Sequence, residues 1–179
     1  MIPQPLHAIR SASRALAVRL AAALFLAAGL IGGAPALPAQ AASVSSCAAS
    51  PSHANCDGVL PGGACTTGTY YVVDTAPLIN TETGRSSNSY GYIQLWWSKN
   101  CQSNWARLVI NVSGSWTAQP YVQTQTGSPG SAYKDYYNAA PGAYVSPMLY
   151  APGVKACADG EAFNSTGDYA AYTGQFTPC

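Results

Sequence analysis

The clearest pattern along the chain is an alternation of apolar and polar side chains over residues 90–98, which repeats over residues 105–112. A period of two places successive side chains on opposite faces of a β-strand. We therefore predict two antiparallel strands joined by the polar loop 99–104. The side chains expected in the core are Gly91, Ile93, Leu95, Trp97, Ala106, Leu108, Ile110 and Val112.

Shorter runs of β-branched and aromatic residues predict further strands, separated by Gly- and Pro-rich turns. Strands are expected at 69–73, 121–126, 144–145, 147–150 and around 163 and 169–176, and turns at 83–84, 127–130 and 151–153. The only stretch that suggests a turn or two of helix is 132–140. This pattern predicts an all-β, small, antiparallel sandwich or barrel with an irregular N-terminal arm over residues 42–68.

Six cysteines change this picture, because they predict covalent bridges: Cys47, Cys56, Cys65, Cys101, Cys157 and Cys179. An even number of cysteines in an exported chain is typical of a disulfide framework, although six allow 15 pairings. We favour Cys47–Cys56, Cys65–Cys101 and Cys157–Cys179. A zinc site is disfavoured, because the chain has no C-x-x-C motif and His53 is the only histidine beyond the leader.

The first 41 residues have the features of a secretory signal peptide. Arg10, Arg14 and Arg19 precede the apolar run 20–31, which is too short to cross a bilayer, and Ala39-Gln40-Ala41 is a small-x-small cleavage motif. We expect cleavage after Ala41, which leaves residues 42–179 as one secreted, extracellular domain without a membrane span.

The charge balance bears on the partners of that domain. Of eight Lys and Arg residues, three lie in the leader, which leaves five basic residues against seven acidic ones. A nucleic-acid-binding domain needs a basic patch, so nucleic acid is not expected as a partner. We expect a monomer with no cofactor.

Candidate catalytic chemistry is sparse. His53 is the only available histidine base for a serine nucleophile, and no G-x-S-x-G motif accompanies it. Glu82 with Glu161 or Asp159 offers a pair of carboxylates for a glycosidase. Asp159 and Glu161 with Asp168 offer calcium ligands without the spacing of a calcium loop. We therefore expect neither a catalytic nor a metal site, and a hydrolase ranks third among the functions considered.

The aromatic residues of the hairpin are the better candidates for binding. If the alternation holds, one exposed face carries Tyr90, Tyr92, Trp96, Trp105 and Arg107. Exposed Trp and Tyr side chains on a sheet stack on sugar rings or anchor a protein partner. Two alternatives stay open at this point: a loop or second sheet covers the face, or Arg107 simply stacks on Trp105.

Several blocks of the chain together resemble one known family. They are Cys56-Asp57-Gly58 with Pro61 and Cys65, Gly91-Tyr92-Ile93-Gln94-Leu95-Trp96-Trp97-Ser98, Cys101, Trp105-Ala106-Arg107, and Ser146-Pro147-Met148-Leu149-Tyr150-Ala151-Pro152. Over roughly residues 47–157 the chain resembles the YjfA-like family of secreted Gram-positive and actinobacterial proteins. This resemblance implies export and a small disulfide-bearing fold, and it implies no activity, since the family is a domain of unknown function.

Taken together, these features favour a secreted, non-enzymatic domain that binds a cell-envelope or extracellular ligand, such as a glycan, through its aromatic face. The alternative is a secreted protein-binding factor, such as a protease inhibitor or a toxin-like protein, that presents the loop 127–130 to its partner.

Overall fold

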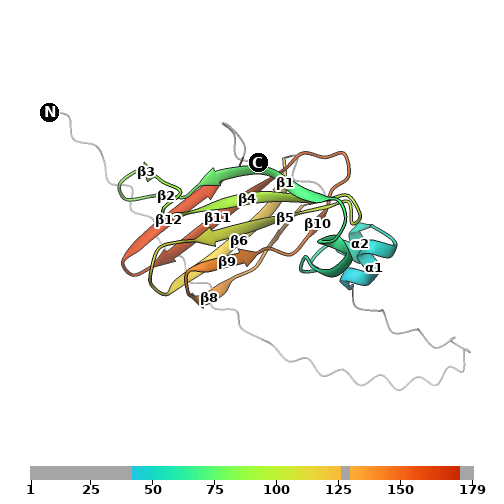
Figure 1. The fold of residues 1–179 in the computed structure, drawn as a ribbon, viewed down its shortest axis with the longest axis horizontal. Helices are drawn as coiled ribbons and strands as arrows, with labels where there is room; N and C mark the ends of the chain where they lie inside the picture. The colour runs from blue at the N-terminus through green and yellow to red at the C-terminus, as the bar shows by residue number, and fades with distance from the viewer. Residues whose placement is uncertain (1–41, 126–129, 174–179) are drawn as a thin grey trace, which may run out of the picture. The chain divides into compact units, whose positions relative to one another are not determined.

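Two antiparallel β-sheets stacked face to face make up the computed structural model, which describes residues 42–125 and 130–173 (Figure 1). The predicted all-β sandwich is confirmed, and the sheets do not close into a barrel. Within the described residues, no helix has the length and hydrophobicity needed to cross a membrane. The predicted leader and its cleavage site after Ala41 lie outside the described residues.

The first sheet, called sheet A here, has five strands in which the predicted hairpin is central. In order across the sheet they are β1 (Tyr70–Pro77), β4 (Gly91–Ser98), β5 (Ser103–Ile110) and β10 (Leu149–Tyr150), with β9 (Gly142–Val145) also paired to β5. The hairpin β4–β5 is antiparallel and places Trp96 opposite Trp105 and Gln94 opposite Arg107. The two strands predicted from the alternation are therefore confirmed.

The second sheet, sheet B, has seven strands. In order they are β3 (Arg85–Ser86), β2 (Ile79–Asn80), β12 (Gly167–Tyr172), β11 (Ala156–Asn164), β6 (Trp116–Thr124) and β7 (Ser131–Tyr133), with β8 (Tyr136–Ala139) also paired to β6. Pro120 lies in β6 between the residues that pair with β7 and those that pair with β8. Because proline has no N–H to donate, it fits this gap between two partner strands.

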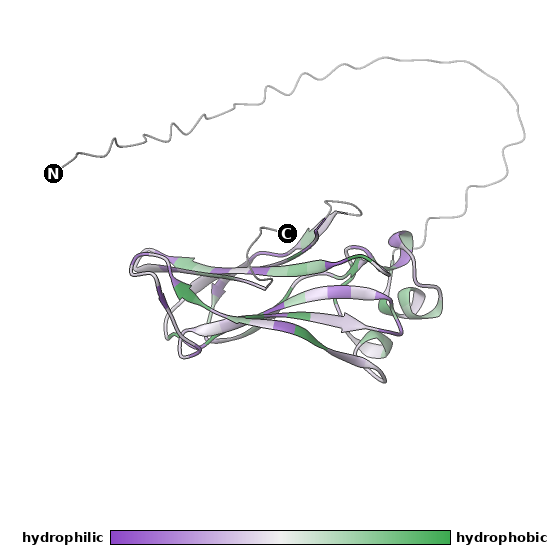
Figure 2. Ribbon diagram, turned by 90° about the horizontal axis from the view of Figure 1, so that it is seen from above, coloured by the Kyte–Doolittle hydropathy of each residue, from purple (hydrophilic) through white to green (hydrophobic). Residues whose placement is uncertain are grey.

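The core fills the space between the sheets, and Figure 2 shows the two layers edge-on. The inward residues Ile93, Leu95, Leu108 and Ile110 are buried, as the alternation predicts. Strand β11 faces them closely at Gly160, where an added Cβ would lie 2.8 Å from Ile93 Cδ1. Glycine at this position therefore allows sheet B to approach the side chains of sheet A.

The N-terminal arm is more ordered than its sequence indicates. It forms α1 (Val44–Ala49), α2 (His53–Cys56) and the 3-10 turn η1 (Gly63–Cys65). Ser43 and Ser46 make a capping box at α1, and the Ser52 side chain accepts a hydrogen bond from the Asn55 N–H at α2. Serine caps stabilise such short helices, but one or two turns are too short to show a helical period in the sequence.

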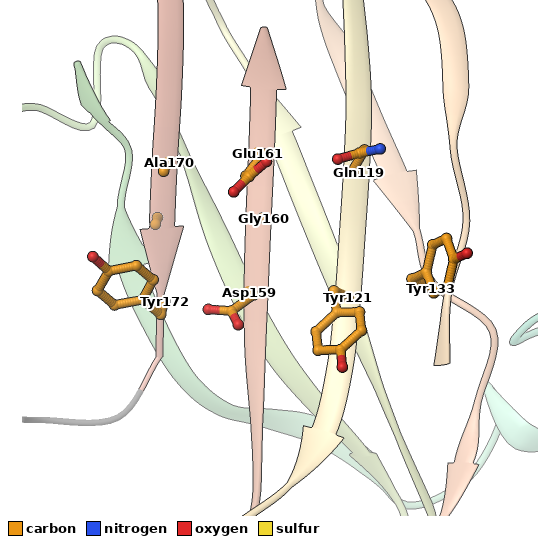
Figure 3. A pocket seen from close by; sticks show the side chains of 9 residues that line it. Gln119, Tyr121, Tyr133, Asp159, Gly160, Glu161, Ala170 and Tyr172 are labelled. Carbon is orange, nitrogen blue, oxygen red and sulfur yellow. The ribbon is translucent and has the colours of Figure 1, made fainter. Parts of the chain in front are cut away.

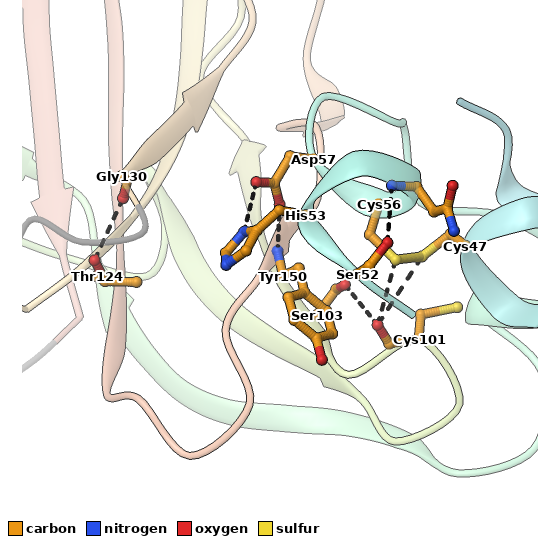
Figure 4. A network of polar contacts seen from close by, with 11 residues as sticks. Cys47, Ser52, His53, Cys56, Asp57, Cys101, Ser103, Thr124, Gly130 and Tyr150 are labelled. Atoms are coloured by element: carbon orange, nitrogen blue, oxygen red, sulfur yellow. Dashed lines mark hydrogen bonds and ion pairs between the residues drawn. A yellow bond between two sulfur atoms is a disulfide. The ribbon is translucent and has the colours of Figure 1, made fainter. Parts of the chain in front are cut away.

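Two of the predicted disulfides are confirmed. Cys47 bonds to Cys56 within the arm (Figure 4). Cys65 bonds to Cys101 in the β4–β5 turn, so this second bridge fastens the arm to the hairpin. The third predicted bridge includes Cys179, which lies outside the described residues, and Cys157 has no free thiol.

The segment 132–140 differs from its prediction. It forms β7 and β8 instead of a turn of helix, and both strands pair with β6. A short segment rich in Tyr and Ala fits a helix or a strand equally well. The open edge of β6 decides for strands, because its backbone N–H and C=O groups would stay unpaired beside a helix.

Candidate functional site

A stack of three aromatic rings forms the main feature of the outer face of sheet A. The Tyr70 and Trp96 rings lie 5.5 Å apart and nearly parallel, and the Trp96 and Trp105 rings lie 6.0 Å apart with an interplanar angle of 11°. The rings come from three neighbouring strands, β1, β4 and β5, whose register brings them side by side. We call these three rings with Arg107 the aromatic shelf.

A single amide oxygen orients two members of the shelf. Gln94 Oε1 accepts a hydrogen bond from Trp96 Nε1 at 3.1 Å and another from Arg107 Nη1 at 3.0 Å. Because both donors share this acceptor, the indole plane and the guanidinium are fixed relative to each other. The remaining N–H groups of Arg107 make no side-chain hydrogen bond or ion pair within the described part of the chain.

The shelf lines a groove with a volume of about 380 Å³. Pro61 and Thr66 of the N-terminal arm border it on one side. Sites for small molecules typically have volumes of about 300–1,000 Å³, so the groove holds a ligand the size of one or two sugar rings. The arm thus supplies part of the site as well as the disulfides.

Trp105 is predicted to lie on an exposed face, but it is buried, with only 3% of its surface accessible. It belongs to a second small core with the Cys47–Cys56 and Cys65–Cys101 bridges and Met148. The arm covers this end of the hairpin, so the alternative in which another segment covers the face holds here. Trp105 still contributes to the lining of the groove.

Tyr90 does not belong to the same face. It lies in the turn before β4, and its ring packs on Tyr169 of β12 with ring centres 5.2 Å apart, next to the main core. The alternation fails at this point because Gly91 has a φ of 137°, which interrupts the strand geometry. Tyr92 is on the outer face but lies opposite Val109, outside the groove.

Arg107 does not stack on Trp105, which is the second alternative that the sequence leaves open. In the described part of the chain, the one cation–π contact joins Lys134 to the Tyr136 ring at 4.8 Å, and Arg107 makes none with Trp105. Arg107 is instead held by Gln94 and faces the groove. Of the five predicted site residues, the structure therefore brings together Trp96, Trp105 and Arg107.

His53 makes a structural contact. Its Nδ1 lies 2.9 Å from Asp57 Oδ2, and Asp57 Oδ1 accepts a hydrogen bond from the Tyr150 N–H at 2.6 Å (Figure 4). Asp57 therefore connects α2 to β10. Among the described residues, no serine hydroxyl is hydrogen-bonded to His53, so this pair lacks the nucleophile that a triad requires.

The possible metal ligands have other roles. Among the described residues, one group of three lies close enough together to hold a metal ion: Cys47, Cys65 and Cys101, whose sulfurs lie within 4.8 Å of one another. These sulfurs belong to two disulfides and have no thiolate to donate. Glu82 lies in the turn between β2 and β3, whereas Asp159 and Glu161 lie on β11.

A second groove, on the outer face of sheet B, is a feature that the sequence analysis missed. It has a volume of about 370 Å³, and its walls include Tyr121, Tyr133 and Tyr172, with Asp159 and Glu161 between them (Figure 3). Burial and the charge of Glu161 raise the pKa of Asp159 above its ordinary value. The sequence gives little indication of this groove, because the three tyrosines come from three separate strands.

The loop 127–130, on which the protein-binding alternative depends, lies almost entirely outside the described residues. Comparison of the chain with family models, with curated proteins and with solved structures gives no match. The resemblance to the YjfA-like family therefore stays a prediction, and the functional argument depends on the geometry of the two grooves.

Proposed function

We propose that this chain is a secreted, non-enzymatic domain that binds an extracellular glycan on its aromatic shelf. The observation that carries the proposal is the stack of Tyr70, Trp96 and Trp105 beside a groove, with Tyr70 40% exposed at its outer end. Sugar rings present apolar C–H surfaces, and the exposed Tyr70 ring at the end of the stack offers them an aromatic contact in water.

Arg107 gives the groove a preference for ligands that carry a negative charge. No carboxylate in the described part of the chain pairs with it, and Gln94 occupies only one of its N–H groups. The other donors suit sugar hydroxyls, and a guanidinium binds a carboxylate or a phosphate more strongly than a neutral group. The preferred glycan is therefore one that carries an acidic group.

Export is part of the proposal and is supported by the disulfides. Disulfide bonds persist in oxidising compartments and are rare in the cytosol, and two bridges are buried in this domain. The features of residues 1–41 point to the same route. Mass spectrometry of culture supernatant tests it: a chain beginning at Ala42 supports export, and a full-length chain confined to the cytoplasm contradicts it.

The binding test uses two adjacent tyrosines as a matched pair. Tyr70 lies on the shelf, whereas Tyr71, which is 52% exposed, lines a groove on the other side of β1. We expect Tyr70→Ala to weaken glycan binding about fivefold, as the loss of ~1 kcal/mol of ring contact implies. Tyr71→Ala should leave it unchanged. A glycan array identifies the ligand, and calorimetry with that oligosaccharide measures the affinity.

A third variant, Arg107→Met, tests the charge preference. It should reduce binding of an acidic oligosaccharide more than binding of its neutral analogue. No binding on a glycan array and in a peptidoglycan pull-down, with the folded domain verified by circular dichroism, would remove the proposal. Equal losses of glycan affinity for Tyr70→Ala and Tyr71→Ala would show that the ligand does not bind on the shelf.

A further inference from the structure

The register of sheet B lines up four side chains across its outer face. Asp159 of β11 lies opposite Tyr172 of β12 on one side and Tyr121 of β6 on the other, and Tyr121 lies opposite Tyr133 of β7. Two positions along β11, Glu161 lies opposite Ala170. The result is a row in which the Asp159 carboxylate is flanked by the Tyr172 and Tyr121 rings, with Glu161 beside it along β11, as Figure 3 shows.

The walls of this groove are aromatic rings left open to solvent. Tyr172 is 64% exposed and Tyr133 is 60% exposed, and the Tyr121 and Tyr133 rings lie 6.1 Å apart at an angle of 40°. The floor between the walls is low, because the small residue Ala170 lies there. Aromatic rings beside a carboxylate in an open groove attract a cation through their π faces.

The charge in the groove is negative and lacks a cationic partner. Asp159 and Glu161 are the charged residues of its lining, and neither forms an ion pair within the described part of the chain. Lys134, the cation that follows Tyr133 in the chain, is not part of the lining and lies over the Tyr136 ring. Gln123 Nε2 donates a hydrogen bond to Asp159 Oδ2 at 3.3 Å, which orients the carboxylate without neutralising it.

The chemistry of the lining distinguishes between kinds of cation. Calcium requires six to eight oxygen ligands, whereas two carboxylates among tyrosine rings supply fewer. A quaternary ammonium has no N–H to donate to the carboxylates. A primary ammonium donates three hydrogen bonds, and its methylene chain fits against the rings.

We propose that this groove binds a primary alkylammonium group, such as the side chain of a lysine in an extracellular peptide. The site is independent of the aromatic shelf, because it lies on the opposite sheet. Burial and the neighbouring Glu161 disfavour the charged form of Asp159, as its raised pKa shows, and a bound cation offsets both effects. Binding should therefore weaken as the pH falls through the pKa of Asp159, and a saturating ligand should lower that pKa.

The test is an NMR titration of the folded domain with n-pentylammonium, a simple probe that carries a primary ammonium on an alkyl chain. We expect millimolar binding, with shifts in the backbone signals of residues 119–121, 159–161 and 170–172. Asp159→Asn should weaken binding about tenfold, because it removes a charge-assisted hydrogen bond. Glu82→Gln, a change of acid in the β2–β3 turn, should leave it unchanged.

The aromatic walls are tested by a second pair of variants. Tyr172→Ala should weaken binding several-fold, whereas Tyr137→Ala, at a residue that is 72% exposed but outside the groove, should not. Tyr70→Ala on the shelf should have no effect, so failure of the glycan proposal leaves this test intact.

Three further ligands keep the proposal open to refutation. Neutral 1-pentanol should not bind, and choline and calcium should bind more weakly than n-pentylammonium. Equal binding of 1-pentanol would show an apolar site. Tighter binding of choline or calcium, or no shift with any amine, would overturn the assignment.

Discussion

The two confirmed disulfides should contribute unequally to stability, and the difference can be worked out from their positions. Cys65–Cys101 joins residues 36 positions apart, and Cys47–Cys56 joins residues 9 positions apart. The loss of loop entropy in the unfolded chain amounts to ~3.8 kcal/mol for the longer loop and ~2.6 kcal/mol for the shorter one. Removing the longer bridge should therefore cost about 1.2 kcal/mol more.

The two double variants, C65A/C101A and C47A/C56A, make a fair comparison because all four cysteines are fully buried. Each variant removes two buried sulfur atoms from the same small core, so the packing losses of the two variants largely cancel. Urea unfolding followed by tryptophan fluorescence gives the free energy of unfolding of each variant. An equal or larger loss in C47A/C56A would refute the reasoning and place the stabilisation in folded-state packing instead of loop closure.

Three other changes have expected outcomes. Gly160→Ala places a Cβ 2.8 and 2.9 Å from methyl carbons of two core residues, and calorimetry should show a destabilisation of about 1–3 kcal/mol; an unchanged melting temperature would contradict the close packing. Burial and the charge of Glu161 raise the pKa of Asp159 in the folded state, so the free energy of unfolding falls as the pH rises through that pKa. Asp159→Asn should therefore raise the melting temperature at pH 7, an advantage that disappears below about pH 3.9; no gain at pH 7 would argue against a destabilising charge. Tyr136→Phe removes the hydrogen bond that its hydroxyl donates to the Val145 carbonyl at 2.8 Å, between β8 and β9, and should cost about 1 kcal/mol in urea unfolding; a neutral result would show that water replaces the bond.

The parts of the fold that the sequence predicts are those with local signals. The alternation in β4 and β5 lies within 20 residues and identifies the hairpin, because each inward side chain is followed by an outward one. The two confirmed bridges join cysteines that are neighbours in sequence or flank the first strands. Local patterns of this kind need no knowledge of the distant chain.

The errors at Trp105 and Tyr90 have different physical origins, and neither is visible in the alternation of the sequence. An alternation with a period of two shows which side chains share a face of a strand, but it does not show what covers that face. Trp105 is covered by the N-terminal arm, some 40 residues earlier in the chain. A disulfide bridge holds the arm there, and the sequence alone does not decide which of the 15 possible pairings forms. At Tyr90 the alternation stops because Gly91 adopts a positive φ, which no side-chain pattern records.

The groove on sheet B escaped prediction because it depends on register between strands far apart in sequence. Tyr121 and Tyr172 are separated by 51 positions, and they flank Asp159 only because β11 lies between β6 and β12. Each tyrosine alone is an ordinary strand residue. The site arises from the order of strands across the sheet, and that order is decided by long-range pairing.

The arrangement of the two proposed sites follows from the sandwich itself. Inner faces are required for the core, so a site on a sheet face lies on its outer side, and sheets in a sandwich pack about 10 Å apart. The aromatic shelf with Arg107 lies on one outer face, and the groove with Asp159 and Glu161 lies on the other. One small ligand cannot touch both, and the opposite charges of the two faces select different ligands. If both proposals hold, a domain bound to an acidic glycan still presents its ammonium site, so it can connect a glycan to a lysine-bearing peptide without either ligand displacing the other.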